Sequence, residues 1–394
     1  MKRIHSILQR IILPCICVAL AMGCTSTNEP EPPQNDITRT VLVYMVANNN
    51  LSSYASQDFK EMLNGMAALP ESAPGRLLVY YAPASSTPEL REVMRDGTSN
   101  TLKSYSDGLS SVDAARMREV IEDARSYTQA DSYGLVLWSH GTGWLHDYGT
   151  IEDEPEQQWT YSFGSDGTPA KKMSIESLNR AIDGIDWDFI YFDCCHMGTV
   201  EVAYELRHRT PVIVACATEL GLEGMPYDLN VAPFFAKEAQ LDVAMGNTFD
   251  YYDYQYRIGY GYGCSISLIR TANLDDLASH TRKILETYGP GSTDYQPVPY
   301  FRKVVMSTGI YDMRHYIESL CTDESLLKRW ADAFDATVAK HSTTAEVYTL
   351  PAKDFHGLGC QIITYPDEAE TYNYKATSWW KDVVSHATFN TDNQ

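Results

Sequence analysis

Two short polar stretches, each at the end of an apolar run, carry side chains suited to nucleophilic chemistry. LWSHGTGW contains His140 and Gly141, and FDCCHMG contains Asp193, Cys194 and Cys195. A cysteine thiol becomes an effective nucleophile when a histidine that is distant in sequence but adjacent in space takes its proton. The two stretches therefore predict a cysteine nucleophile paired with His140, on the condition that the fold brings the two apolar runs side by side.

The elements that carry these stretches are predicted to be strands of one sheet. Apolar runs rich in valine and aromatic residues, without polar alternation, cover residues 40–47, 76–84, 133–141, 188–193 and 211–218. Such runs are typical of strands buried on both faces of a parallel sheet, and helical patterns separate them. We therefore predict an α/β/α sandwich with a mostly parallel central sheet. Ligands of such sheets bind beyond the carboxyl ends of the strands, where both polar stretches lie.

Together the two stretches resemble the clostripain family of cysteine peptidases, whose strands end in His-Gly and in Asp-x-Cys-x-Met. The likeness includes TVLVYMVANNNLSSY near the start and GMPYDL at 224–229, and it extends weakly to HGLGCQIITYP at 356–366. It implies a caspase-like fold, shared with gingipains and legumains, and cysteine endopeptidase activity. In this resemblance His140 matches the catalytic histidine and Cys195 matches the nucleophile.

Only one of the two adjacent cysteines can face the histidine, because successive side chains at a strand end point to opposite sides. The helix predicted over GTVEVAYELR begins directly after them, and its N-terminus lowers the pKa of a nearby thiol. These arguments and the resemblance assign Cys195 as the nucleophile and His140 as its general base and acid. The backbone N–H groups of Gly141 and Cys195 are the predicted oxyanion hole. The alternative is that Cys195 is a buried and inert thiol.

Substrate selection is predicted to depend on acidic side chains beside the nucleophile. Asp193 lies two residues before Cys195, so its side chain leaves the strand on the same side. In clostripain-like peptidases the matching aspartate helps to select arginine or lysine, and Asp228 in GMPYDL is a second acidic candidate by the same resemblance. Arginine is expected to be preferred, because its guanidinium can pair with a carboxylate through two hydrogen bonds. The alternative role for Asp193 is to cap the following helix, and both roles can hold.

The segment between the two catalytic candidates is a predicted processing site. Residues 146–172 are rich in glycine, proline and acidic residues, which predicts an exposed loop open to cleavage. Its basic residues are Lys171 and Lys172. Members of the clostripain family often mature by self-cleavage in this interval, so we expect any cut to follow one of these lysines. The alternative is a loop that is never processed.

The N-terminal residues are predicted to be a targeting signal. MKRIHSILQR carries positive charges and no acidic residue, and an apolar segment of about a dozen residues follows it. LAMGC resembles the bacterial lipoprotein signal, which implies that residues 1–23 are a signal peptide and that Cys24 is the lipidated N-terminus. The expected location is then the outer membrane or the cell surface. If Cys24 is not lipidated, the chain is an ordinary secreted protein.

Three further regions are predicted after the signal. Residues 24–38 are polar and rich in proline, as in a disordered tether. Residues 39–290 hold the strand and helix patterns of the caspase-like peptidase domain. From 291 to 394 the pattern becomes mixed, which predicts a smaller C-terminal accessory region.

Charge and residue spacing limit the partners. The formal net charge of −21 repels nucleic acid and favours basic peptide or protein substrates. The consecutive residues Cys194, Cys195 and His196 lack the gap that lets side chains converge on one zinc ion, so no metal or cofactor is predicted. The sequence carries no signal for a calcium requirement or for the oligomeric state. The alternative function is a non-catalytic binding lipoprotein that retains the peptidase fold.

Overall fold

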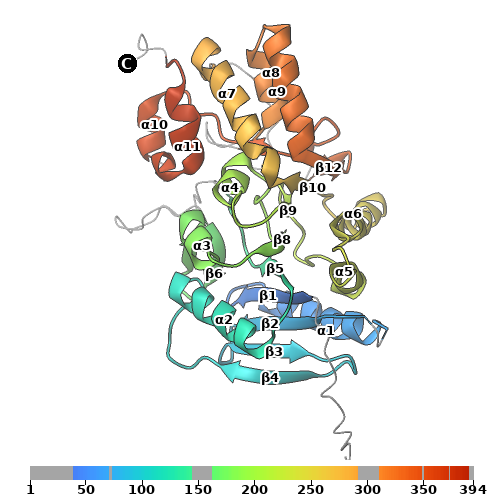
Figure 1. The fold of residues 1–394 in the computed structure, drawn as a ribbon. Coiled ribbons are helices and arrows are strands. Elements are labelled where there is room, and N and C mark those ends of the chain that lie inside the picture. The colour runs from blue at the N-terminus through green and yellow to red at the C-terminus, as the bar shows by residue number, and fades with distance from the viewer. Residues whose placement is uncertain are drawn as a thin grey trace, which may run out of the picture. The chain divides into compact units, whose positions relative to one another are not determined.

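The order of the strands explains how the two polar stretches meet. The computed structural model describes residues 39–70, 73–143, 162–291, 310–347, 350–371 and 373–389. Within this part of the chain the strands of the central sheet follow the order β12-β10-β9-β8-β5-β1-β2-β3-β4 (Figure 1). The middle of the sheet is formed by β1 (Arg39–Ala47), β2 (Arg76–Pro83), β5 (Ser132–Trp138), β8 (Trp187–Asp193) and β9 (Val212–Cys216).

These five strands run parallel to one another. On each side of them, the next strand is antiparallel to the strand it pairs with. The edge strands are β3 (Glu89–Val93) and β4 (Ser99–Ser104) on one side and β10 (Ser265–Arg270) and β12 (Val338–Thr343) on the other. Every residue of β1 is buried, which agrees with the apolar run that predicted this strand. The predicted mostly parallel sheet is confirmed.

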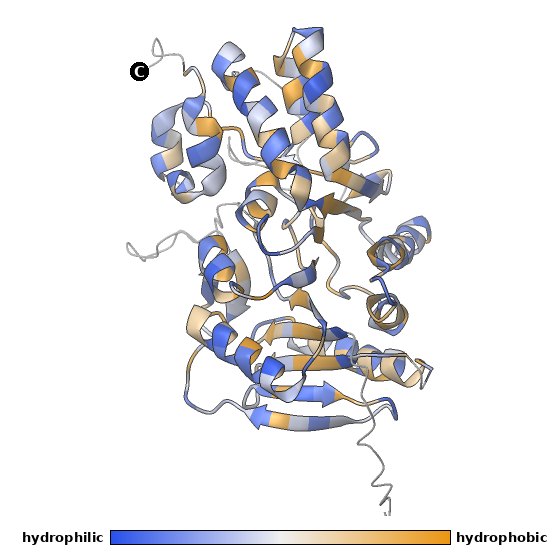
Figure 2. Cartoon of the chain, in the orientation of Figure 1, coloured by the Kyte–Doolittle hydropathy of each residue, from blue (hydrophilic) through white to orange (hydrophobic). Residues whose placement is uncertain are grey.

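Helices cover both faces of the sheet because the side chains of each strand alternate between two apolar cores. Leu42, Tyr44 and Val46 of β1 pack into one core, and Val41 and Val43 pack into the other. Hydrophobic residues accordingly mark the central strands in Figure 2. The first core is covered by α2 (Ala114–Tyr127), α3 (Ile175–Ala181), α4 (Val200–Glu205) and α7 (Leu274–Tyr288), and the second by α1 (Ser52–Ala67), α5 (Tyr227–Phe234) and α6 (Leu241–Arg257).

The C-terminal residues share the sheet and the first core with the earlier part of the chain. Strand β12 pairs with β10, and Trp330 and Phe334 of α9 pack in the same core as α7. The proposed domain boundary at residue 290 stays a prediction. The elements of this part are α8 (Met313–Leu320), α9 (Glu324–Thr337), α10 (Pro366–Thr371), α11 (Ser378–Asp382), β11 (Tyr311–Asp312), β13 (Glu346–Val347), β14 (Leu350–Pro351) and β15 (Gly359–Cys360), with short 3-10 turns at Thr271–Asn273, Tyr374–Ala376 and Val384–His386.

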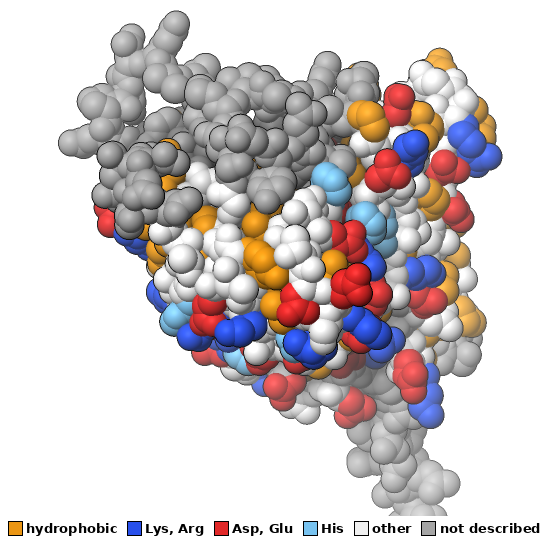
Figure 3. Space-filling model, turned by 90° about the horizontal axis from the view of Figure 1, so that it is seen from above, with side chains coloured by type: hydrophobic (Ala, Val, Ile, Leu, Met, Phe, Trp, Pro, Cys, Tyr) orange, Lys and Arg blue, Asp and Glu red, His pale blue; other side chains and the backbone are white. Residues whose placement is uncertain are grey.

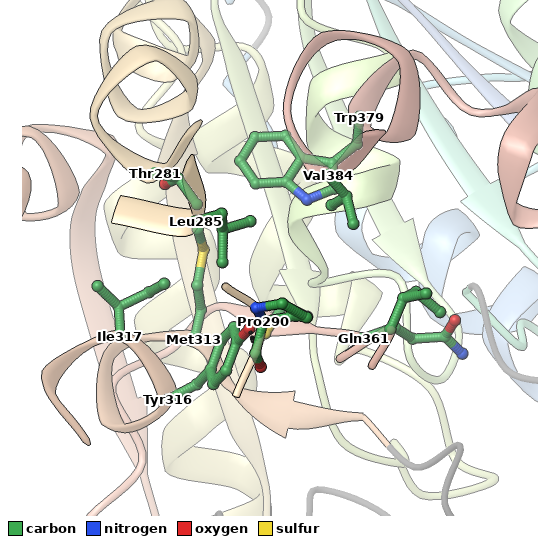
Figure 4. Close-up of a pocket in the computed structure, with 11 residues that line it drawn as sticks. Thr281, Leu285, Pro290, Met313, Tyr316, Ile317, Gln361, Trp379 and Val384 are labelled. Atoms are coloured by element: carbon green, nitrogen blue, oxygen red, sulfur yellow. Dashed lines mark hydrogen bonds between the residues drawn. The ribbon is translucent and has the colours of Figure 1, made fainter. Parts of the chain in front are cut away.

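A small apolar cavity lies among α7, α8 and α11. Leu285 of α7, Met313 and Ile317 of α8 and Trp379 of α11 point toward it (Figure 4). The surface seen in Figure 3 interleaves acidic and basic side chains with scattered hydrophobic ones. We found no helix within the described ranges that is long and apolar enough to cross a membrane.

One expectation about the chain between the catalytic candidates is wrong. Residues 162–166 do not form an exposed loop, because β6 (Ser162–Asp166) is buried and pairs with β7 (Lys171–Ser174) as an antiparallel hairpin, whereas residues 168–171, at the turn of this hairpin, are exposed. Strand β6 was not predicted because its sequence, SFGSD, is rich in serine and glycine. The rest of the predicted loop lies outside the described residues. The predicted signal peptide, Cys24 and the tether lie outside them as well.

Candidate active site

His140 and Cys195 follow two strands that end side by side at one edge of the sheet. Strands β5 and β8 are parallel neighbours, and the last residue of β5, Trp138, pairs with the last residue of β8, Asp193. His140 and Cys195 each follow two residues later. Both therefore reach one pocket at the carboxyl edge of the sheet. Its lining is Leu51, Trp138, Ser139, His140, Asp193, Cys194, Cys195, Leu220, Gly221, Leu222 and Gly224.

The two cysteines lie on opposite sides of the sheet, as the sequence predicted. Cys194 is buried in the core beneath α2 and α4, whereas half-buried Cys195 packs against the core beneath α1 and α5. The Leu220 N–H donates to the Cys195 sulfur at 3.3 Å, and the thiol lies 3.6 Å from the Leu220 carbonyl oxygen. The predicted lowering of the Cys195 pKa by the following helix is wrong, because burial raises the pKa of this thiol to about 12 and α4 begins only at Val200. In this state the sulfur keeps its proton at neutral pH, so nucleophilic attack requires a base.

His196, the third polar residue of the stretch, has a structural role. Its backbone adopts a positive φ of 62°, and its N–H donates to the Thr218 carbonyl oxygen at 3.0 Å. Its Nδ1 lies 3.2 Å from the Ala217 carbonyl oxygen. Burial lowers the pKa of His196 to about 4, so the ring stays neutral. His196 is thus buried and turned toward the backbone directly after β9, which supports the structural role.

His140 is held from two sides. Its Nε2 lies 2.7 Å from Oδ1 of Asn50, in the loop that follows β1. Its carbonyl oxygen accepts from the Gly164 N–H at 2.9 Å, so strand β6 runs alongside the histidine loop. Sequence reasoning found neither contact. The asparagine triplet after the first apolar run was a visible signal, but nothing in its spacing pointed to residue 140.

Gly141 occupies a position with no room for a side chain. A Cβ atom at Gly141 would lie 2.5 Å from the Cys195 carbonyl oxygen and 3.1 Å from the Cys194 sulfur. Gly141 also pairs with Phe163 of β6 as an isolated bridge. The backbones of Gly141 and Cys195 are thus in contact, as a shared oxyanion hole needs, while the role itself stays a prediction.

Asp193 lies on the pocket wall and is fixed by two donors. Its Oδ2 accepts from the Tyr227 hydroxyl at 2.9 Å, and its Oδ1 accepts from the Met225 N–H at 3.1 Å. Burial raises the pKa of Asp193 to about 7 even though both hydrogen bonds favour the ionised form. The alternative role as a helix cap is wrong, because Thr199 is the N-cap residue of α4.

A second buried carboxyl group, missed by the sequence analysis, lies next to Asp193. Asp58 of α1 accepts from the Trp138 indole N–H at 2.6 Å. A Cβ atom on Gly224 would lie 2.9 Å from Oδ2 of Asp58 and 3.0 Å from Oδ2 of Asp193, so this glycine separates the two carboxyl groups. Burial, and then repulsion by Asp193, raise the pKa of Asp58 to about 9. Its position on the buried face of α1 was the available signal.

The remaining predicted residues lie elsewhere. Asp228 is exposed in the first turn of α5, and the described residues that line the pocket do not include it. Lys171 and Lys172 are on β7, where Lys171 pairs with Asp166. Within the described part of the chain, no three histidine, cysteine or acidic side chains are grouped to hold a metal ion.

A thiol and an imidazole in one pocket, at the carboxyl edge of a mostly parallel sheet covered by helices on both faces, define a cysteine peptidase of the caspase-like fold. Comparison with family models makes the assignment specific. The clostripain family model matches residues 43–376, and the chain belongs to that family. It is therefore a cysteine peptidase, a hydrolase of peptide bonds.

Solved structures of C11 cysteine proteases resemble this chain over most of its length. A secreted C11 cysteine protease from Bacteroides thetaiotaomicron, in complex with an irreversible peptide inhibitor, is 28% identical with a TM-score of 0.75, and the match covers 88% of this chain and 98% of that one. An inactive zymogen C11 protease from Parabacteroides distasonis is 26% identical with a TM-score of 0.74, and the match covers 88% and 97% of the two chains. The search of curated proteins gave no match.

Proposed function

We propose that this peptidase is an endopeptidase that uses a Cys195–His140 dyad and cleaves after arginine or lysine. The observation that carries the proposal is that both side chains line one pocket, together with the buried carboxyl group of Asp193. His140 takes the thiol proton as the Cys195 sulfur attacks the scissile carbonyl carbon and the new S–C bond forms. The imidazolium then gives this proton to the leaving amine as the C–N bond breaks. Water, deprotonated by His140, hydrolyses the thioester and restores the thiol.

The raised pKa of Cys195 supports a base that acts during the attack. Because burial holds the thiol protonated, a thiolate forms only as the proton passes to His140. The oxygen of the tetrahedral intermediate is stabilised by the N–H groups of Gly141 and Cys195, whose backbones are in contact. Gly141 and Cys195 directly follow the ends of β5 and β8, so the positions of their N–H groups are set by the fold before the substrate binds.

The pocket supports selection of a basic residue before the scissile bond. Asp193 lies on its wall, and Asp58 lies behind Gly224. A cationic side chain lowers the energy of ionised carboxyl groups that burial otherwise disfavours. Arginine is preferred to lysine because its guanidinium offers two parallel hydrogen bonds. The net charge of −21 also attracts basic substrates toward the molecule.

Two further features belong to the proposal. The chain is exported, with Cys24 as a lipidated N-terminus at the outer membrane or cell surface, and the similar protein from B. thetaiotaomicron is described as secreted. The chain also cleaves itself after Lys171 or Lys172. Both lysines lie on β7, so this cut requires the β6–β7 hairpin to open first. A similar C11 protease is described as an inactive zymogen.

The test of the dyad is covalent labelling. An irreversible peptidyl inhibitor with arginine next to its thiol-reactive group should label the wild-type protein and block its cleavage of arginyl peptides. Cys195→Ala should do neither, while its folded state stays intact by circular dichroism. Labelling that persists at full extent in Cys195→Ala contradicts the proposal.

A further inference from the structure

We propose that Asn50 is a positioning residue that fixes the tautomer and the orientation of His140. The inference rests on the proposed dyad and adds a third member to it. Nothing in the spacing of the catalytic stretches pointed to this residue. The contact joins His140 Nε2 and Asn50 Oδ1 at 2.7 Å, which is a short distance for a hydrogen bond between neutral groups.

The chemistry of the contact decides where the proton of His140 lies. An amide oxygen can only accept, so the neutral imidazole carries its hydrogen on Nε2 and its lone pair on Nδ1. Nδ1 is then the nitrogen that takes the thiol proton, and Nε2 keeps its hydrogen bond to Asn50 before and after the transfer. The acceptor at Nε2 therefore favours the tautomer and the ring orientation in which Nδ1 can take the thiol proton.

The loop around Asn50 is built to hold this oxygen in place. The Asn49 amide group donates to the Ser165 carbonyl oxygen at 2.7 Å and to the Val46 carbonyl oxygen at 3.2 Å. Its own Oδ1 accepts from the Leu51 N–H at 2.8 Å. Through these bonds Asn49 holds the loop on either side of Asn50 against β1 and β6.

Strand β6 supports the acceptor and the histidine at the same time. The Asn48 amide group donates to Oδ1 of Asp166 at 2.8 Å, and the Asn48 carbonyl oxygen accepts from the Gly167 N–H at 2.9 Å. The same strand donates from the Gly164 N–H to His140. Asn50 and His140 thus share one support, so the distance between them is set by the fold. Of the three asparagines, Asn48 and Asn49 form hydrogen bonds with nearby segments of the same chain. Exposed Asn50 contacts His140.

The amide of Asn50 can orient the ring of His140 without the electrostatic effect that a carboxylate at this position would have. A carboxylate at residue 50 would stabilise the imidazolium and raise the pKa of His140, by about one unit or more for a charge in direct contact. The neutral acceptor orients the ring without placing a charge beside it. The other titratable side chains that line this pocket are Asp193, Cys194 and Cys195, and none of them changes in the variants below.

The experiment compares Asn50→Ala, Asn50→Asp and the matched control Asn100→Ala, an exposed asparagine on the edge strand β4. Turnover of an arginyl peptide is measured per labelled Cys195, from about pH 5 to 9, so that inactive protein does not count. In Asn50→Ala we expect kcat to fall by about ten- to a hundredfold, within the range that a positioned acid–base group contributes, with little change in KM. Asn100→Ala should match the wild type in kcat, KM and melting temperature.

Asn50→Asp separates positioning from a general structural effect. It keeps an oxygen at the same place whichever way the group turns, so it should recover most of the lost kcat. It should also move the limb of the pH–rate profile that reports His140 to higher pH. Unchanged kcat in Asn50→Ala overturns the inference, and so does an equal loss in both variants with no displaced limb. If Cys195→Ala still cleaves the peptide, the dyad itself has failed, which is a different result.

Discussion

The Tyr227 hydroxyl donates a hydrogen bond of 2.9 Å to Oδ2 of Asp193, so the aspartate two residues before Cys195 is fixed by the first residue of α5. This bond and that from the Met225 N–H keep the carboxyl group on the pocket wall and oppose the effect of burial on its pKa. The carboxyl group is therefore placed for a substrate before the substrate arrives. In our proposal this carboxyl group selects a basic residue of the substrate.

Asp193→Asn tests the specificity. Losing the charge from a buried pair costs about 2–5 kcal/mol, so kcat/KM for arginyl peptides should fall by tens-fold or more. The variant should still react with a small thiol reagent at Cys195, because the nucleophile is intact. The matched control is Asp228→Asn, which removes an exposed charge outside the pocket lining and should leave kcat/KM unchanged. Equal cleavage after neutral and basic residues by the wild type contradicts the assignment.

Asp58→Asn tests the buried carboxyl pair through stability. The pKa of Asp58 is raised to about 9 and that of Asp193 to about 7, so the folded protein holds protons that the unfolded chain has already released. The free energy of unfolding should therefore fall as pH rises from about 4, the usual carboxyl pKa, through the two raised values.

Urea unfolding at several pH values in this window measures the effect. Asp58→Asn removes one of the two groups, so its free energy of unfolding should decrease less steeply with pH than that of the wild type. At alkaline pH the variant should be more stable than the wild type, because it does not bury the charge that Asp58 acquires when it ionises. The asparagine can still accept the hydrogen bond from the Trp138 indole. A slope equal to that of the wild type would show that Asp58 does not titrate in this range.

The parallel core of the fold could be predicted because its strands are buried on both faces and read as continuous apolar runs. Strands β3 and β4 could not, since they have partly exposed and polar sequences, ELREV and SNTLKS. That His140 and Cys195 reach one pocket followed from the rule that ligands bind where parallel strands end at one edge. Asn50 reaches the site from the loop after β1 and Asp58 from α1, and their contacts depend on packing that the spacing of residues in the sequence does not record.

Processing can be tested by incubating the purified protein. Wild-type protein should convert from one band to two fragments, with the new N-terminus after Lys171 or Lys172. Replacing both lysines with alanine should prevent the cut, and Cys195→Ala should remain a single chain. Since β6 bonds to His140 and to the asparagine loop, the cut protein and the intact protein should also differ in kcat. A cut that persists in Cys195→Ala excludes self-cleavage.

Lipidation of Cys24 is tested by mass spectrometry and fractionation. The mature N-terminus should be Cys24 with attached acyl chains, and the protein should sediment with membranes. Cys24→Ser should be released in soluble form with its peptidase activity unchanged. A membrane-bound Cys24→Ser protein, or a mature N-terminus elsewhere, rules out the anchor.

The central claim is that Cys195, and not its neighbour, is the nucleophile. The most direct measurement is the site of covalent attachment of an irreversible arginyl inhibitor, read by peptide mass spectrometry in the wild type, Cys194→Ala and Cys195→Ala. Our account predicts one adduct on Cys195 in the wild type and in Cys194→Ala, with peptide cleavage retained in both before inhibition, and no adduct in Cys195→Ala. An adduct on Cys194, or cleavage that survives in Cys195→Ala, contradicts it.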